Sequence, residues 1–415
     1  MHEMKDSGIS WIADIPEHWS VSKIGGLYSL RVTKVSDRDY PPLSVTNKGI
    51  LPQLETAAKT NAHDDRKLVC KGDFAINSRS DRRGSCGISS YTGSVSLINT
   101  ILRPMTEMHP QYYDWLFHTI QFGDEFYKWG HGIVDDLWTT GWQDMKKISI
   151  PTPPIAEQAV IADFLDEQCA EIDSLISDIQ SQIEALEEYK KSLVFQVVSN
   201  GTRKSKLQNT ISDVWLTIPE NWKLVDIKYL FEIIKRIAGQ EGFDILSVTQ
   251  KGLKVKDIST NEGQIAESYA GYQFVYPTDY VMNHMDLLTG WVDCSTMFGV
   301  TSPDYRVFRL RDKENNDLTY FKYVMQCCYM SRIFYSLGQG VSNLGRWRLQ
   351  TSAFNNFMIP VPPLEEQCEI AEYLDTKISE IDTIIADKQK QIETIEEYKK
   401  SLIFEYVTGK KEVSV

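Results

Sequence analysis

The side chains of this sequence best suited to chemistry are basic and polar ones that gather in short loops. Arg79, Arg82 and Arg83 lie within the run SRSDRRG at residues 78–84, directly after a strand-like segment. Arginine reads guanine edges and binds phosphates through its planar fork of donors. This pattern predicts a loop that binds anions or base edges. An ordinary solvated surface loop is the plain alternative.

Further candidates of the same kind lie elsewhere in the chain. Lys48 follows the strand-like run LSVT, and Lys251 follows a second LSVT run. A later polar and basic stretch supplies the remaining candidates, which are Gln339, Asn343, Arg346 and Arg348.

Motifs for catalysis are missing from the sequence. It contains no G-x-x-x-x-G-K-[ST] phosphate loop and no Asn/Asp-Pro-Pro-aromatic methylation motif. Nuclease-like E-x-K triplets at 188–190 and 397–399 fall inside predicted helices, and His131 has no metal-ligand neighbours. The seven cysteines show no paired C-x-x-C spacing, which suits a reducing, cytoplasmic setting. We therefore expect no catalytic residue and no metal site in this chain.

The element that must position these loops is a repeat. Residues 153–198 return as residues 362–407 at a constant offset of 209, with 26 of 46 aligned positions identical. In both copies apolar residues recur at alternating steps of four and three, which is a coiled-coil stripe. A double proline precedes each copy, and Gly201 and Gly409 follow as stop signals. The sequence predicts two long helices that pair with each other.

Charge is distributed unevenly. The net charge is −13, yet residues 151–204 and 360–415 carry −6 each, while residues 1–150 carry −1 and residues 205–359 carry 0. Acidic helices repel DNA and suit protein partners, whereas a balanced segment can still present a basic face.

The two balanced segments are themselves loose copies. The motif I-P-E-x-W occurs at 15–19 and 218–222, and the G-x-G loop at 130–132 corresponds to 338–340. Strand-like runs at 42–46, 73–77, 279–283 and 305–310 lie between turns, and one helix per segment is expected near 112–122 and 320–335. We predict α+β modules that share a scaffold and differ in their loops.

Together these motifs resemble those of a known family. A module that opens on I-P-x-x-W, a G-D-F strand at 72–74, a late G-x-G loop, and I-P-x-P-P-x-x-E-Q running into a long helix occur in this order twice. The chain resembles the DNA-specificity subunit of a type I restriction–modification enzyme. The second copy departs from the pattern at 277–280, where PTDY lacks the glycine.

The resemblance implies an α+β fold of two homologous target-recognition domains joined by two long antiparallel coiled-coil helices, a pseudo-two-fold tandem repeat. The domains would span residues 1–150 and 205–359, and the spacer helices 151–204 and 360–415. Each domain would read one half of a bipartite site in double-stranded DNA. The chain would be non-catalytic and would bind no cofactor or membrane. S-adenosylmethionine, ATP and magnesium would belong to two methylation subunits and two restriction subunits.

The two helices share the identical run EEYKKSL, and identity between copies is expected where both meet the same kind of partner. The residues predicted to dock the methylation subunits are Glu187, Glu188, Tyr189, Lys190, Glu396, Glu397, Tyr398 and Lys399.

Two alternatives remain open at the level of sequence. The chain could be the recognition subunit of a methylation-only or phage-defence complex, which its own residues do not distinguish. It could also be a scaffold whose two modules bind ligands other than DNA. Steep dependence of DNA affinity on salt would separate a DNA binder from such a scaffold.

Overall fold

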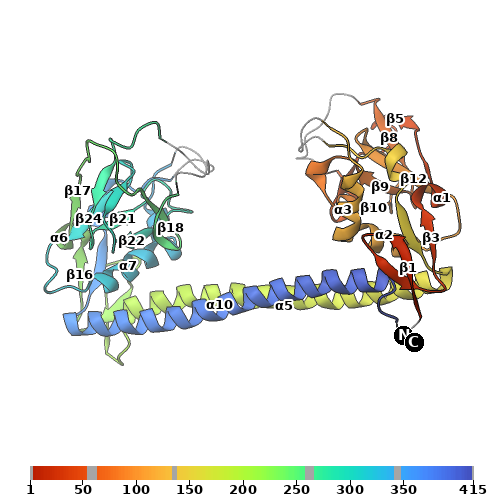
Figure 1. Ribbon diagram of the computed structural model, residues 1–415. Helices are drawn as coiled ribbons and strands as arrows, with labels where there is room; N and C mark the ends of the chain where they lie inside the picture. The colour runs from red at the N-terminus through yellow and green to blue at the C-terminus, as the bar shows by residue number, and fades with distance from the viewer. Residues whose placement is uncertain (1–2, 54–62, 133–137, 258–265, 341–346, 414–415) are drawn as a thin grey trace. The chain divides into compact units, whose positions relative to one another are not determined.

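The fold is organised by two long helices that run side by side in opposite directions (Figure 1). The computed structural model describes residues 3–53, 63–132, 138–257, 266–340 and 347–413. Helix α5 spans Ile155–Asn200 and helix α10 spans Leu364–Val407. Two ion pairs connect them, with Lys399 Nζ 2.6 Å from Asp173 and Lys190 Nζ 2.6 Å from Asp382. The pair of long helices predicted from the repeat is confirmed, and so is the antiparallel arrangement that the family resemblance implied.

The buried face of each helix is the predicted stripe. Because the stripe repeats every seven residues, it stays on the side that faces the other helix. Gly201 and Gly409 end the helices with φ of +73° and +70°, a conformation that glycine adopts without steric cost. The buried stripe residues are Leu165, Cys169, Ile179, Ile183, Leu193, Leu374, Ile381, Ile385 and Leu402.

The chain forms two compact units that each contain part of both helices. Unit 1 consists of residues 1–179 and 389–415, and unit 2 consists of residues 180–388. In each unit, a module packs on the start of one helix and the end of the other. The end of α10 therefore belongs to the module that begins the chain.

The module of unit 1 is an antiparallel α+β fold. Its strands are β1 (Met4–Ile9), β2 (Ala13–Pro16), β3 (Ser20–Lys23), β4 (Tyr28–Leu30), β5 (Lys34–Val35), β6 (Leu43–Thr46), β7 (Gly49–Pro52), β8 (Arg66–Val69), β9 (Phe74–Asn77), β10 (Cys86–Ile88), β11 (Gly93–Ser96), β12 (Asn99–Pro104) and β13 (Ser149–Thr152). Its helices are α1 (Ile24–Leu27), α2 (Pro110–Phe117), α3 (Ile120–Lys128) and α4 (Trp142–Met145), with a 3₁₀ turn at Ser80–Arg82.

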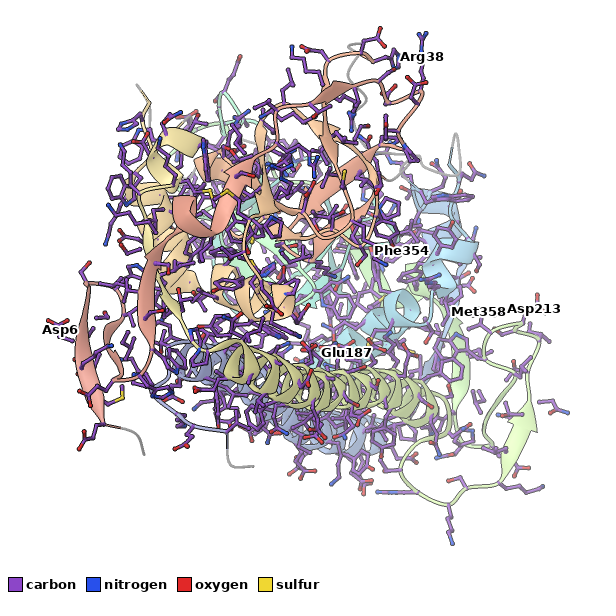
Figure 2. The ribbon with its side chains drawn as sticks, turned by 90° about the vertical axis from the view of Figure 1, so that its right-hand side faces the viewer. Asp6, Arg38, Glu187, Asp213, Phe354 and Met358 are labelled. Atoms are coloured by element: carbon purple, nitrogen blue, oxygen red, sulfur yellow. The ribbon has the colours of Figure 1, made fainter. Side chains whose placement is uncertain are left out.

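The module of unit 2 repeats this arrangement. Asp213, labelled in Figure 2, lies in the turn of its first hairpin, between β14 and β15. Its strands are β14 (Leu207–Asn209), β15 (Thr217–Pro219), β16 (Lys223–Asp226), β17 (Phe231–Ile234), β18 (Leu246–Thr249), β19 (Gly252–Val255), β20 (Gln273–Val275), β21 (Tyr280–Met282), β22 (Val292–Cys294), β23 (Gly299–Thr301), β24 (Arg306–Leu310) and β25 (Met358–Val361). Its helices are α6 (Ile227–Leu230), α7 (Leu318–Met330), α8 (Ile333–Ser336) and α9 (Thr351–Asn356).

The central sheets of the two modules have the same strand order. In unit 1 it is β10-β9-β12-β4, and in unit 2 it is β22-β21-β24-β17, all antiparallel. One face of each sheet packs on aromatic residues of the following helices, such as Phe74 on Phe117 at 4.5 Å between ring centroids and Phe231 on Phe321 at 5.6 Å. The shared scaffold of two homologous modules is therefore confirmed.

The helices of the modules differ from the expectation of one helix each. The prediction of a single helix at 112–122 was wrong, because α2 ends at Phe117 and Thr119 begins α3 by accepting a hydrogen bond from the Phe122 amide. In unit 2, Arg332 takes a left-handed conformation with φ of +54° and separates α7 from α8. Apolar spacing alone did not reveal either break.

The missing glycine of the second module does not change the turn. Gly72 has φ of +87°, and Thr278 at the corresponding position has φ of +75°. The next residues, Asp73 and Asp279, are both buried and both bond the backbone amide three residues earlier. The turn is thus the same in both modules, but in unit 2 the β-branched Thr278 adopts a left-handed conformation that favours glycine and is strained for threonine.

This strain predicts the effect of one substitution. We expect Thr278→Gly to stabilise unit 2 by about 0.5–1 kcal/mol, because relief of the left-handed strain outweighs the added entropy of the unfolded glycine. Calorimetry of the full chain should show a melting temperature about 1–4 °C higher. The reverse change, Gly72→Thr, should lower it, and a drop caused by Thr278→Gly would contradict the argument.

Among the described residues, no helix is long and apolar enough to cross a membrane.

Candidate functional site

The joint between module and helix in unit 1 is built from the two motifs that begin and end the module. Strand β3 pairs with β13, which brings Trp19 next to the start of α5. Trp19 Nε1 donates to Glu157 Oε2 at 2.8 Å, and His18 Nε2 lies 2.7 Å from Glu157 Oε1. Gln158 accepts from the His109 amide at 2.9 Å and so ties α2 to α5.

The joint in unit 2 has the same contacts. Trp222 Nε1 donates to Glu366 Oε2 at 2.8 Å, and Asn221 Nδ2 donates to Glu366 Oε1 at 2.6 Å. Gln367 accepts from the Asp317 amide at 2.8 Å. The Trp of one motif and the Glu-Gln of the other are therefore explained by a single hydrogen-bonded joint that occurs twice.

Each tryptophan also contacts the end of the other helix. A side chain on Gly201 would lie 3.1 Å from the Trp222 ring, and one on Gly409 would lie 3.0 Å from the Trp19 ring. Glycine thus permits both the turn and the close approach. The sequence indicated where the long helices begin and end. It did not indicate that, in each unit, the beginning of one helix and the end of the other contact the same tryptophan.

The exposure of the two joints predicts unequal effects of the same mutation. Glu366→Ala should cost about 1–3 kcal/mol, since Glu366 is 8% exposed and its loss leaves the Trp222 indole N–H without an acceptor. Glu157 has a side chain that is 37% exposed, so water can replace it and Glu157→Ala should cost less. Thermal unfolding of both variants checks this. Equal losses would contradict the role of burial.

The arginine loop of unit 1 lies at the end of strand β9 and forms the 3₁₀ turn. Arg79 Nε lies 3.1 Å and Arg82 Nε 3.8 Å from the Asp81 carboxylate, so one acid serves two arginines. Arg83 pairs with Asp124 at 3.0 Å and lies over the Tyr127 ring. Arg82, with a side chain 67% exposed, is the most available of the three. The loop therefore has a net positive charge, and contacts with Asp124 and Tyr127 of the same module fix its geometry.

Lys48 and Lys251 occupy matching turns. Lys48 follows β6 and Lys251 follows β18, and in each turn the lysine amide donates to the preceding threonine hydroxyl, at 3.1 Å and 3.2 Å. Both side chains are exposed. The structure therefore places them equivalently, as the sequence alignment of the two modules predicted.

The polar stretch of unit 2 lies at the corner that corresponds to the arginine loop. Gln339 and Arg348 pair through both backbone hydrogen bonds, at 3.0 and 3.1 Å, as His131 and Thr139 do in unit 1. Asn343 and Arg346 lie outside the described residues. Gln339 and Arg348 thus lie together at one corner of the module.

The run EEYKKSL has two kinds of residue with different placements. Lys190 and Lys399 form the ion pairs between the helices, so they stabilise the coiled coil. Glu188 bonds Lys191 and Glu397 bonds Lys400, each at 2.6 Å. Tyr189 and Tyr398 are 56% and 55% exposed and make an apolar surface. Glu187 and Glu396 are exposed as well.

Two further apolar residues join these tyrosines, and the sequence reasoning missed them. Leu175 and Ile384 are 49% and 44% exposed and are related by the same offset of 209. Leu175, Tyr189, Ile384 and Tyr398 each directly precede a position of the heptad stripe, at 176, 190, 385 and 399. In an antiparallel coiled coil, residues at this heptad position lie on the same side of the helix pair. We call Leu175 with Tyr398 the unit 1 flank patch, and Ile384 with Tyr189 the unit 2 flank patch. The repeat offset was the signal that could have found them.

The opposite flank of the coiled coil contacts the modules. Asp166, which directly follows stripe residue Leu165, accepts from Trp115 Nε1 at 2.8 Å. Asp375, which follows Leu374, accepts from the Tyr323 hydroxyl. In each unit the flank patch therefore lies on the side of the helices that the module leaves open.

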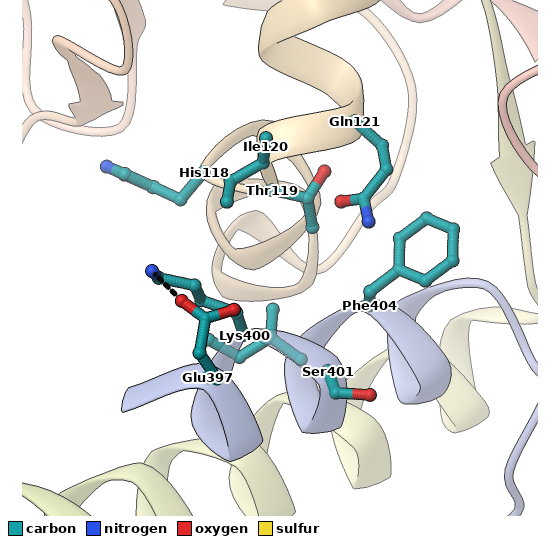
Figure 3. Close-up of a pocket in the computed structure, with 9 residues that line it drawn as sticks. His118, Thr119, Ile120, Gln121, Glu397, Lys400, Ser401 and Phe404 are labelled. Carbon is teal, nitrogen blue, oxygen red and sulfur yellow. Dashed lines mark hydrogen bonds and ion pairs between the residues drawn. The ribbon is translucent and has the colours of Figure 1, made fainter. Parts of the chain in front are cut away.

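Grooves occur at this contact between module and helices. In unit 1 a groove of about 250 Å³ lies between His118–Gln121 and α10, where Glu397 and Lys400 bond each other (Figure 3). In unit 2 a groove of about 560 Å³ is lined by Lys251, by Lys190 and by Glu187, which projects from α5 in Figure 2. The unit 2 groove has the more polar lining of the two, and within the described part of the chain no cluster of metal-ligating side chains is found.

Comparisons with known proteins agree with this architecture. The model of a family described as type I restriction modification DNA specificity domain matches residues 219–394. The type I restriction enzyme MjaVIII specificity subunit of Methanocaldococcus jannaschii is 25% identical, over 95% of this chain and 93% of that protein. The likeness therefore extends over both units.

Solved structures show the same fold. A chain from a study of complex assembly and conformational transition of the type I R-M system aligns with a TM-score of 0.68 at 12% identity, covering 96% of this chain and 99% of that one. The HsdS subunit from Thermoanaerobacter tengcongensis aligns with a TM-score of 0.50 at 13% identity, covering 96% and 98%.

The family model covers the second module with its helix, and the repeat carries the same joint, sheet order and helix into the first. The full-length likeness to a curated relative adds the order of all four parts. This chain is therefore similar in sequence over residues 219–394, and in fold over nearly its whole length, to specificity subunits of type I restriction–modification enzymes.

Proposed function

We propose that the chain is the non-catalytic DNA-recognition subunit of a type I restriction–modification complex, and that each module reads one half of a bipartite site. The observation that carries the proposal is the contrast between the copies. Joint, sheet and helices are the same in both units, whereas the corner loops differ in sequence and charge. Two copies of one scaffold with different loops suit two different DNA sequences.

The second part of the proposal concerns partners. We infer that two methylation subunits dock on the helices, one on each flank patch. Both patches are apolar and exposed and are flanked by Glu397 and Glu188, with side chains 73% and 74% exposed, so they suit protein rather than DNA. A duplicated surface binds two copies of the same partner. Two restriction subunits would join the assembly through these partners.

The cofactors would belong to those partners. S-adenosylmethionine for adenine methylation, and ATP with magnesium for restriction, would be held by the partner subunits. The chain itself carries none of the sequence motifs for them. A system with methylation subunits and no restriction subunit remains a second candidate. Native mass measurement of the complex purified from its host would distinguish the two.

The test of DNA recognition is the salt dependence of binding. The complex with methylation subunits should bind its methylated sequence with an affinity that falls linearly on a log–log scale as salt rises. A scaffold for other ligands would not show this dependence, and binding without it would overturn the proposal.

The arginine loop gives a sharper prediction. The triple variant with Arg79→Ala, Arg82→Ala and Arg83→Ala should bind DNA more weakly in the complex. Loss of one arginine that reads a base should cost about 1–3 kcal/mol of binding free energy and relax the sequence preference at one position of a single half-site. Loss of a phosphate contact would instead lower the salt slope and leave the sequence unchanged. Methylation mapping and binding assays separate these effects. Wild-type affinity, slope and sequence in the triple variant would show that the loop is ordinary surface.

A further inference from the structure

One corner of the unit 2 module holds a buried arginine that bonds only neutral groups among the described residues. Arg306, at the start of β24, is 4% exposed. Its guanidinium donates to the Leu349 carbonyl at 3.0 Å and to Thr351 Oγ1 at 3.3 Å, and it lies 4.5 Å from the centre of the Phe354 ring. Burial lowers the pKa of Arg306 to about 10, which still leaves it charged at neutral pH.

A buried charge without a counter-ion is costly, and proteins normally pair it. Among the described residues, the charged side chain that lowers the pKa of Arg306, after burial, is a second cation, Arg348. The adjoining segment 341–346 has the sequence VSNLGR and contains no carboxylate. Among the described residues, Arg306 has no carboxylate hydrogen-bonded to it.

Two more polar groups of this corner have no hydrogen-bond partner in the part of the chain that the structure describes. His284, the second residue after β21, is 9% exposed, and among the described residues its Nδ1 has no partner. Its backbone carbonyl accepts from the Leu349 amide at 2.9 Å, so it lies beside the segment that carries Arg348. Burial, and then the charges of Arg306 and Arg348, lower the pKa of His284 to about 3, so the ring is neutral. The Trp347 indole N–H is also buried and has no partner within residues 266–340 and 347–413 or the other described ranges.

The unit 1 module fills the same positions with a closed neutral pair. By sheet register, His284 corresponds to Ser78 and Arg306 to Thr100, and the Ser78 and Thr100 hydroxyls bond each other at 2.9 Å. The Thr140 amide donates to the Ser78 carbonyl, as the Leu349 amide does to His284. The scaffold thus does not require a cation here, and unit 2 has acquired one.

We propose that His284, Arg306 and Arg348 form a phosphate-binding site of the second module, and that its ligand is a backbone phosphodiester of the DNA that this module recognises. The inference rests on the proposed function and adds a site that only one module has. Arg348 is exposed and supplies the outer contact, while Arg306 and His284 form the floor. Arginine and a neutral imidazole donate hydrogen bonds to phosphate oxygens.

The location supports this ligand. In unit 1 the loop with Arg79 and Arg82 begins at the same strand end, one residue after Ser78. Both modules therefore concentrate positive charge at one equivalent corner, in an exposed loop in unit 1 and partly beneath the surface in unit 2. An anion bound by both corners would be a repeated one, as the phosphates of a duplex are.

The test uses the complex with methylation subunits and two variants of the site. His284→Ser with Arg306→Thr imports the pair that the first module already folds with, and Arg348→Gln removes the exposed cation alone. Arg309→Gln is the matched control, since Arg309 is an exposed arginine of the same strand that pairs with Glu232. The measured quantity is the slope of log affinity against log salt on the methylated sequence.

Losing one phosphate contact should reduce the slope of log affinity against log salt by about 0.9. The ratio of wild-type affinity to variant affinity should then fall about 3.5-fold between about 50 and 200 mM salt. The methylated sequence and the slope of the control should be unchanged. If wild-type DNA affinity falls steeply with salt and both site variants have the same slope as the wild type, the phosphate site is overturned and the proposed function stands. A wild type without salt-steep binding would overturn both.

Free phosphate is the other source of the same chemistry. Millimolar inorganic phosphate is compared with chloride of equal ionic strength by thermal unfolding of the full chain. If phosphate stabilises the wild type but not the site variants, and the DNA slopes are unchanged, the site holds a free anion only and the DNA contact is refuted.

Discussion

A complex assembled with the variant Tyr398→Asp should hold one methylation subunit instead of two. Tyr398 and Leu175 form the unit 1 flank patch, on the side of the helices that the module leaves open. Removing an aromatic anchor from an interface costs about 2 kcal/mol or more, or roughly 30-fold in affinity, and a buried carboxylate costs more. Tyr189→Asp should remove the other subunit, and the double variant should hold neither.

Native mass measurement at a fixed excess of methylation subunit gives the counts. The control is Ile211→Asp, which places the same charge on an exposed apolar residue of the hairpin between β14 and β15, 88% exposed. It should leave two subunits bound. Two subunits at wild-type affinity in the double variant would refute docking on the flank patches, while the melting temperature reports whether the variant is folded.

Seven residues inserted into both long helices, after Ile176 and after Ile385, should change the gap between the two half-sites. Each helix begins in one unit and ends in the other. Seven residues keep the stripe on its face, and equal insertions keep the pairing. The helices lengthen by about 10.5 Å, which is about three base pairs along a duplex. Neither half-site should change, because no module residue has changed.

Methylation mapping of the variant complex measures the gap. The same insertion in α5 alone is the control, because it leaves the two helices unequal in length and should lower stability and activity together. A full-activity double insertion with the original gap would refute the proposal that the helices set the spacing. Altered half-sites would show that the helices themselves take part in recognition.

The sequence by itself determined the repeat, the paired helices and their ends. These features follow from short-range rules, since a heptad stripe, a double proline and a terminal glycine act within a few residues. The same is true of the strand runs, because alternation and turn residues are local. Even the turn at Thr278 kept its conformation, since the buried Asp279 bonds the backbone there as Asp73 does at Gly72.

Only the tertiary structure decided which of the candidate residues are available. Arg83 was indistinguishable from Arg82 in sequence, yet it pairs with Asp124, 41 residues later, and lies over Tyr127. Lys190 and Lys399 were predicted to meet a partner, and the structure uses both to hold the coiled coil. The physical reason is that the availability of a charge depends on neighbours brought close by folding, which no local pattern specifies.

The proposed functional surfaces also depend on contacts between residues that are distant in the sequence. Leu175 and Ile384 are apolar residues outside the stripe, and they form patches with Tyr398 and Tyr189 only because the helices run antiparallel. His284 and Arg306 stand 22 residues apart in sequence and meet across the end of a sheet. Local periodicity determined the elements of this protein, and long-range pairing determined what those elements expose.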